Sequence, residues 1–389
     1  MIYEPARGAE ELRWRVTAAA PLERDTPQYY RALDGLRGLA ILIVIAEHWW
    51  AYKAVLPFGG AVGVNIFFVL SGFLITEILL RQRGTPVGAA LRKFWWRRSL
   101  RIFPVYYLYV AILMAAGVPF AASLLPWALS YTINIYTATT GDIGSLLFSH
   151  LWSLSIEEQF YLAWPVVVLL TSDRWLRRLL IAIPLAAIAF RYYALTRLEF
   201  GNEIAYRMTP AALDALGLGA ILAYLKSNSR SLWARLMKRG NLLTVAILVT
   251  GSVAVVLAHT GPSWYPLVER TSSALLGAAL VCGLLSEKTP GILRRAFTNK
   301  LMVSLGKISY GLYVYHLLSQ YLLEPTLRNW IQQTPALTSG FVGYNQYIVS
   351  MPIYFAGALL LAGVSFVVME RPLLRFKSAA ARQPIGPTS

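Results

Sequence analysis

Charged residues are scarce in this chain of 389 residues. Asp, Glu, Lys and Arg together make up 14% of it, whereas an average soluble domain carries about 25%. Apolar residue types reach 57%, and the mean hydropathy is +0.52. This composition argues against a soluble globular domain and against a disordered chain, and it predicts an integral membrane protein.

Cysteine and histidine are also rare, and several common catalytic motifs are missing. The single cysteine, Cys282, excludes an intramolecular disulfide and a thiolate metal cluster. The four histidines, His48, His150, His259 and His316, are far apart in sequence and show no metal-ligand spacing, so we expect no metal site. The sequence contains no Walker loop, no dinucleotide-binding fingerprint and no serine-centred nucleophile elbow.

Long apolar stretches are abundant instead. A helix that spans a bilayer needs about 20 mostly apolar residues. Ten stretches meet this requirement, at roughly 33–52, 60–80, 102–118, 150–171, 178–195, 209–225, 241–258, 271–286, 301–323 and 347–369. The sequence therefore predicts an all-α polytopic membrane protein with about ten transmembrane helices.

The net charge of +17 could indicate a nucleic-acid-binding protein. However, Lys and Arg accumulate in cytoplasmic loops, and a ten-span arrangement with both termini cytoplasmic puts most of the 36 basic residues on that side. A further apolar stretch at 121–138 would invert every later loop if it crossed the bilayer. We therefore expect a re-entrant or external helix at 121–138, and no nucleic-acid partner.

Polar segments flank the apolar region. Residues 1–32 have no apolar core after a basic start, so we interpret them as a cytoplasmic amino-terminal arm and not as a signal peptide. Residues 33–375 then form the transmembrane domain, and 376–389 form a cytoplasmic tail. Segment 86–101 alternates aromatic and basic residues, which is typical of an amphipathic helix at the membrane interface.

Ionisable residues inside a span are costly and mark functional sites. The first span contains Asp34, Arg37, Glu47 and His48. On a helix, Arg37 and His48 share one face and stand about 16 Å apart along the axis. Acyl-CoA, with phosphates at one end and a thioester at the other, suits that spacing. The alternative is an Arg37 that anchors to lipid headgroups and a His48 that is hydrogen-bonded in the interior.

The fourth span, HLWSLSIEEQFYLAWP, contains Glu157 and Glu158. A glutamate that meets His48 would orient the ring and stabilise its protonated form. A structural ion pair with an arginine is the alternative. Arg98 and Arg101 are three residues apart, so they share a helix face, and two guanidinium groups suit a pyrophosphate. Anchoring of these two arginines to lipid headgroups is again the alternative.

The ninth span brings Ser309, Tyr313 and His316 onto one face. His316 is thus a second candidate for a functional buried imidazole, with interior hydrogen bonding as the alternative. His150 and His259 fall at span ends, and we interpret them as interfacial residues.

The motifs resemble the bacterial membrane acyltransferase-3 family over about residues 30–375. The resemblance rests on six segments in the family's order: LDGLRGLAILIVIAEH with Arg37 and His48, GVNIFFVLSGFLIT, RRSLRIFPVYY, LWSLSIEEQFYLAWP, ISYGLYVYH, and Glu370-Arg371-Pro372. The fourth motif singles out Glu157 over Glu158. Asn65 stands where the family often has Asp. A fused carboxy-terminal hydrolase-like domain is missing from this sequence, which predicts the stand-alone type.

The resemblance implies an O-acyltransferase in the bacterial plasma membrane. Its donor would be cytoplasmic acyl-CoA, usually acetyl-CoA, and its acceptor a sugar hydroxyl of a cell-surface or exported glycan. His48 would remove the hydroxyl proton, Glu157 would orient or charge His48, and Arg37, Arg98 and Arg101 would bind the CoA phosphates. The expected supporting residues are Asp34, Glu47, Trp152, Ser153, Glu158, Tyr161, Ser309, Tyr310, Tyr313 and His316.

Two other classes of protein compete with an enzyme. A proton-coupled transporter or flippase for a glycolipid or glycan could use buried Glu, His and Arg as a relay, but we find no inverted repeat and no matching pair of broken helices. A scaffold for cell-envelope assembly would not need buried ionisable residues. The identity of the acceptor, the acyl chain length and the oligomeric state stay open at this level.

Overall fold

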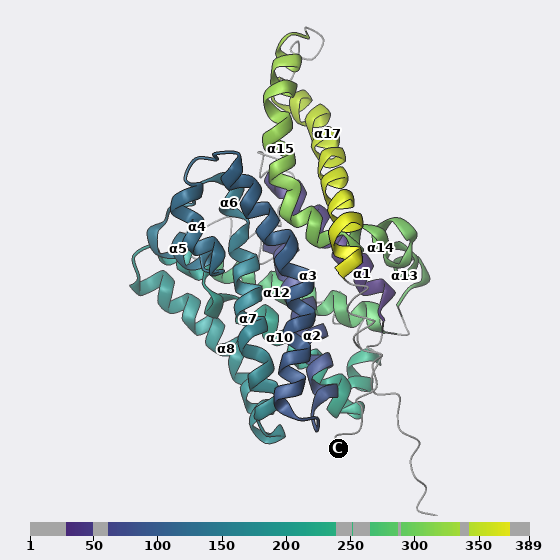
Figure 1. Cartoon of the computed structure of the whole chain (residues 1–389). Helices are drawn as coiled ribbons and strands as arrows, with labels where there is room; N and C mark the ends of the chain where they lie inside the picture. Colours follow the sequence, from purple (N-terminus) through teal and green to yellow (C-terminus); the bar gives the residue numbers. More distant parts are fainter. Residues whose placement is uncertain are drawn as a thin grey trace, which may run out of the picture. The chain divides into compact units, whose positions relative to one another are not determined.

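The computed structural model describes residues 29–49, 61–238, 251, 265–286, 289–334 and 342–373, and the regular structure in these ranges is helical (Figure 1). Arg31–Ser389 forms one compact unit. Its helices are α1 (Arg31–Trp49), α2 (Ala61–Gln82), α3 (Val87–Ala115), α4 (Ala121–Leu129), α5 (Ile133–Thr140), α6 (Leu146–Ser149), α7 (Leu151–Leu170), α8 (Asp173–Arg197), α9 (Gly201–Arg207), α10 (Thr209–Asn228), α12 (Tyr265–Leu285), α13 (Gly291–Thr298), α14 (Lys300–Lys307), α15 (Ser309–Gln332), α17 (Val342–Ser365) and the π-helical turn η1 (Phe366–Glu370).

The described residues contain six helical stretches that are long and apolar enough to cross a membrane. They are Val62–Gln82, Val87–Ala115, Asp173–Arg197, Gly201–Asn228, Pro266–Leu285 and Val349–Leu373. These stretches confirm a polytopic, all-helical membrane protein. The predicted spans at 33–52 and 150–171 form α1 and α7, which are helical but carry more polar side chains. The predicted span at 241–258 lies almost wholly outside the described residues.

Four predicted elements differ from the helices observed. The predicted interfacial helix at 86–101 and the predicted span at 102–118 form one helix, α3, of 29 residues. At 1.5 Å per residue, α3 is about 43 Å long, which exceeds the roughly 30 Å hydrocarbon core. Its amino-terminal third can therefore extend beyond the core, as the basic sequence of 86–101 indicates.

The predicted helix at 121–138 is interrupted and forms α4 and α5. Tyr131, between them, adopts a left-handed backbone conformation with φ of 55°. The hydroxyl groups of Tyr106 and Tyr107 on α3 donate hydrogen bonds to the carbonyl oxygens of Ala128 and Leu129, over 3.0 and 3.1 Å. These bonds hold the end of α4 against α3, where Ala128 also accepts a backbone hydrogen bond from Tyr131. Neither short helix is long enough to cross a bilayer.

The predicted span at 301–323 is divided into α14 and α15 at Ile308. Just before this break, Gly306 allows α14 to approach α1 closely. A side-chain carbon on Gly306 would overlap the backbone carbonyl of Asp34 on α1. Close helix approach through small residues is typical of membrane proteins, and here it fixes α14 against the end of α1 that carries Arg37. Beyond the turn, α15 runs beside α17 (Figure 1).

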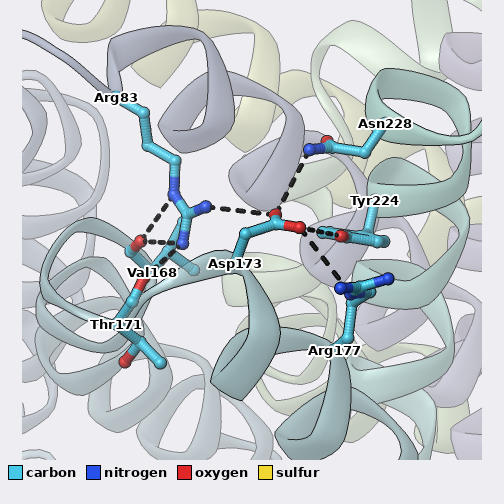
Figure 2. Close-up of polar contacts among 7 residues, drawn as sticks. All are labelled: Arg83, Val168, Thr171, Asp173, Arg177, Tyr224 and Asn228. Atoms are coloured by element: carbon cyan, nitrogen blue, oxygen red, sulfur yellow. Dashed lines mark hydrogen bonds and ion pairs between the residues drawn. The ribbon is translucent and has the colours of Figure 1, made fainter.

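A polar cluster ties together the ends of α2, α7, α8 and α10 (Figure 2). The Arg83 guanidinium donates hydrogen bonds to the carbonyl oxygens of Val168 and Thr171, over 2.7 to 2.9 Å, and so caps α7. Asp173 accepts a 2.8 Å hydrogen bond from Tyr224 and forms ion pairs of 3.5 Å with Arg83 and 3.7 Å with Arg177, while the Asn228 amide donates to it over 3.4 Å. This cluster is about half exposed and has a structural role.

Candidate active site

A pocket opens between α1, α2, α3, α7 and α15. The residues that α2 contributes, Val64, Phe67, Phe68 and Ser71, follow helical spacing and so share one face. Ten of the residues singled out from the sequence line this pocket: Arg37, Arg98, Arg101, Ser153, Glu157, Glu158, Tyr161, Ser309, Tyr310 and Tyr313.

Three arginines converge on the pocket from two helices. Arg37 comes from α1, and Arg98 and Arg101 come from α3. The nearest carboxylate oxygen to the Arg37 guanidinium belongs to Asp34, at 3.8 Å. Within the described part of the chain, Arg98 and Arg101 form no ion pair or hydrogen bond, although Arg98 lies over the ring of Tyr161 at 5.2 Å. We call Arg37, Arg98 and Arg101 the pocket arginines. Their unused N–H donors suit an anionic ligand.

Glu157 lies beside these arginines and is held by a short hydrogen-bonded chain. The Ser71 hydroxyl donates to Glu157 Oε1 over 2.6 Å. Because that bond uses the only proton of Ser71, the Tyr161 hydroxyl must donate to Ser71 across their 2.9 Å contact. The structure thus gives Glu157 a partner on α2. Its predicted role toward His48 stays a prediction.

Glu158 and the tyrosines form another wall of the pocket. Within the described residues, Glu158 Oε2 is buried without a hydrogen-bond partner. The Tyr310 hydroxyl donates to the Ile102 carbonyl over 2.9 Å, and the Ser309 hydroxyl donates to the Gly306 carbonyl over 2.9 Å. The Tyr310 bond fixes α15 against α3, and the Ser309 bond joins the start of α15 to α14. The Glu158 oxygen is left available to a ligand hydroxyl.

His48 lies beyond the pocket, in a cluster of imidazoles. Since α1 is continuous from Arg37 to His48, the axial separation of about 16 Å expected from the sequence holds. The Nδ1 atom of His48 lies 2.8 Å from the Val44 carbonyl oxygen. A carbonyl can only accept, so Nδ1 carries the proton and Nε2 keeps its lone pair. Nε2 is therefore the nitrogen able to act as a base.

Tyr313 connects the pocket to this cluster. It lines the pocket, and its ring centroid is 5.8 Å from that of His316. Its hydroxyl donates to the His150 carbonyl over 3.0 Å and contacts the Ser153 hydroxyl at 2.5 Å. Ser153 and Tyr313 therefore line the pocket on the side where the imidazoles lie.

The remaining predicted residues lie around the site without lining the pocket. Asp34 pairs with Arg37, and Glu47 precedes His48 on α1. Trp152 faces away from the arginines of the pocket, and the Arg270 guanidinium lies 5.6 Å from its ring. The structure therefore places Trp152 next to a second group of charged residues.

Sequence reasoning missed several buried polar residues. Arg191 and Asp214 form an ion pair of 2.6 Å with exposed fractions of 0% and 2%. Arg270 is also fully buried. The rule that singled out Arg37, an ionisable residue in an apolar helix, applies equally to these three. The interpretation of His150 as interfacial was wrong, because it is 1% exposed and packs against other rings. His259 lies outside the described residues, so its predicted place at the membrane interface stays a prediction.

The fold and the pocket define a class, a polytopic helical membrane protein with a buried basic pocket that leads toward an imidazole. The chain belongs to the acyltransferase-3 family, a family of membrane O-acetyltransferases. The family model, described as an acyltransferase domain, matches residues 30–369. This match covers all of the helices that line the pocket.

Several bacterial proteins are similar to this chain. The peptidoglycan O-acetyltransferase OatA of Listeria monocytogenes is 28% identical over 320 residues, which is 75% of this chain and 50% of the relative. A Bacillus subtilis protein provisionally named as a peptidoglycan O-acetyltransferase, YrhL, is 36% identical over 36% of this chain and 24% of its own length. The chain thus spans half or less of these relatives. No solved structure matches it significantly.

Proposed function

We propose that this protein transfers an acetyl group from cytoplasmic acetyl-CoA to a hydroxyl of a sugar in a cell-surface or exported glycan. The observation that carries the proposal is the set of pocket arginines, whose guanidinium groups face one cavity. Among the described residues their shortest ion pair is the 3.8 Å contact of Arg37 with Asp34, although Glu157 and Glu158 line the same cavity. A protein that buries such charges for stability alone would pair them. The guanidinium donors that lack close partners here suit the phosphates of CoA.

The distance between the two ends of the site supports the same donor. Acetyl-CoA carries its phosphates and its thioester at opposite ends of a thin arm. The pocket arginines lie at one end of α1, and His48 lies about 16 Å further along it. With phosphates at Arg37, the pantetheine arm can extend along α1 toward His48.

His48 acts in this proposal as the general base. Its Nε2 lone pair accepts the proton of the acceptor hydroxyl while the hydroxyl oxygen attacks the acetyl carbonyl carbon. We favour direct transfer over an acyl-histidine intermediate, and trapping of a labelled enzyme in the absence of acceptor would contradict this choice. Glu157 contributes its charge beside Arg98 and Arg37, and its effect on His48 is part of the proposal.

The membrane arrangement completes the proposal. We place the protein in the bacterial plasma membrane with about ten spans and both termini cytoplasmic, so that the pocket arginines face the CoA supply. The amino-terminal arm at 1–32, the transmembrane domain at 33–375 and the tail at 376–389 keep their predicted boundaries. Because Cys282 is the single cysteine, cysteines introduced one at a time into a Cys282→Ser variant can test each loop by labelling from either side.

One assay tests the enzymatic function. Membranes that contain the full chain are incubated with acetyl-labelled acetyl-CoA, and label in glycan is counted for wild type, His48→Ala and Glu157→Ala. A Cys282→Ala variant is the control, since Cys282 lies on α12 and lines no part of the pocket. We expect transfer by wild type and control, and its loss in His48→Ala. Equal transfer by all four proteins would contradict the proposal. Transport of a glycolipid or glycan without acetyl transfer would favour the alternative, a flippase.

A further inference from the structure

Three of the four histidines meet inside the protein. The ring centroids of His48 and His316 are 4.9 Å apart, and those of His316 and His150 are 5.1 Å apart. They come from α1, α15 and the turn before α7. His316 is 0% exposed and His150 is 1% exposed. Residues more than 100 positions apart in sequence thus form one row of imidazoles that begins at the proposed base.

Backbone contacts fix which nitrogen of each ring carries a proton. His316 Nδ1 lies 2.7 Å from the Tyr313 carbonyl oxygen, and His150 Nε2 lies 3.2 Å from the Val314 carbonyl oxygen. Since carbonyl oxygens only accept, both nitrogens are N–H donors. The lone pairs therefore lie on His316 Nε2 and His150 Nδ1. Among the described residues neither nitrogen has a hydrogen-bond partner.

A buried acceptor without a partner destabilises the fold, and this structure has two side by side. In the described residues, no group of three His, Cys, Asp or Glu side chains has the geometry of a metal site. A lone pair on one imidazole can stabilise positive charge on a neighbouring ring. Among the described residues, Glu47 on α1, Tyr109 on α3 and Tyr313 on α15 are the other titratable side chains next to the three rings.

We infer that His316, with His150 behind it, is a positioning residue that stabilises the proton taken up by His48 during transfer. The inference rests on the proposed acetyl transfer. In that reaction the acceptor O–H bond breaks, its proton bonds to His48 Nε2, and the oxygen bonds to the acetyl carbon. The C–S bond then breaks, its electron pair stays on sulfur, and the proton passes from His48 to sulfur to give the CoA thiol.

Between these two steps His48 is a buried imidazolium. No carboxylate among the described residues hydrogen-bonds to its ring, so the usual histidine–carboxylate pair does not stabilise it. The neutral ring of His316, 4.9 Å away, offers a lone pair to the charge, and His150 offers a second one to His316. The cluster holds one proton and resists a second, because two buried positive charges would repel each other.

Kinetics of the full chain with acetyl-CoA test this role. His316→Phe keeps a planar ring of similar size but has no lone pair. We expect it to lower kcat about 10- to 100-fold, with the KM for acetyl-CoA changed by less than about 2-fold. The rise of activity with pH should also move to lower pH, because His48 loses a group that favours its protonated form. His150→Phe should give the same changes at about 3- to 10-fold.

Two further variants separate this role from a structural one. His316→Gln supplies an acceptor oxygen and should recover part of the kcat that His316→Phe loses. If His316→Phe does not accumulate in membranes, the kcat and pH profile of His316→Gln are compared with wild type instead. Tyr315→Phe, next to His316 on α15, is the matched control and should stay within about 2-fold of wild type. A wild-type protein that transfers acetyl, with His316 variants that keep its kcat and pH profile, contradicts this inference alone. A wild-type protein that transfers nothing contradicts the proposed function, and this inference with it.

Discussion

Arg191 and the pocket arginines differ in how fully the protein pairs their guanidinium groups. Arg191, inside the bundle, donates hydrogen bonds to Asp214 over 2.6 Å, to Thr271 over 2.8 Å and to the Ala211 carbonyl. The pocket arginines line a cavity instead, and their shortest ion pair is the 3.8 Å contact between Arg37 and Asp34. Arg191 thus has three hydrogen-bond partners in the protein, although its Nε has none, whereas Arg98 and Arg101 form no hydrogen bond or ion pair among the described residues. The contrast suits a structural role for Arg191 and a ligand-binding role for the pocket arginines.

The largest loss of stability should follow from removing one partner of the ion pair between Arg191 and Asp214. Arg191→Leu leaves the carboxylate of Asp214 buried and unpaired, and removing one partner of such a pair costs about 3–5 kcal/mol. We expect the variant to accumulate poorly and to melt at a much lower temperature in detergent. The double variant Arg191→Leu/Asp214→Leu should recover most of the loss, because it removes both charges. A single variant that melts like wild type would contradict a structural role for the pair.

Substitution of the pocket arginines should weaken the binding of acetyl-CoA without lowering the stability of the fold. A charge-assisted hydrogen bond is worth about 1.5–3 kcal/mol, so Arg98→Gln or Arg101→Gln should raise the KM for acetyl-CoA about 10- to 100-fold. The melting temperature should stay close to wild type or rise, since repulsion among the three charges falls. Arg92→Gln, an exposed position on the same helix, is the matched control. An unchanged KM in both pocket variants would remove these arginines from the donor site.

The contrast also shows what can be predicted from sequence. Periodicity within one helix paired Arg98 with Arg101, and the rule on ionisable residues in apolar helices singled out Arg37 and Glu157. All four residues line the pocket. Both rules apply to neighbours along one helix. Neither rule predicts which helices meet, so the contact of Ser71 with Glu157 and the contact of His150 with His316 could not be predicted.

The breaks in the fold have the same origin. Apolar composition predicted single helices at 121–138 and 301–323, and it gave no sign of their interruption. At the first break, hydroxyl groups of Tyr106 and Tyr107 bond from α3 to the last carbonyl groups of α4. Next to the second break, Gly306 lies against α1. Both are contacts between separate segments, which a hydropathy profile of one segment does not contain.

A smaller effect should come from the link between Glu157 and α2. Ser71→Ala removes the donor to Glu157 and the acceptor of Tyr161, at a cost of about 1 kcal/mol for a hydrogen bond of this kind. We expect kcat/KM to fall about 5-fold. Ser155→Ala on α7, whose hydroxyl bonds to the Leu151 carbonyl over 3.1 Å, loses a hydrogen bond away from the pocket and should keep its kinetics. Equal kinetics in the two variants would show that the Ser71 contact only supports the fold.

The smallest effect should come from the exposed cluster around Asp173 (Figure 2). Asp173 has a side chain that is 48% exposed, and its ion pairs with Arg83 and Arg177 are 3.5 and 3.7 Å long. Exposed pairs of this kind contribute about 0.2–1 kcal/mol and are screened by salt. Asp173→Asn should therefore lower the melting temperature slightly at low salt, and the difference should shrink at high salt, with kinetics unchanged. A loss as large as that of Arg191→Leu would mean that exposure does not separate the two kinds of ion pair in this protein.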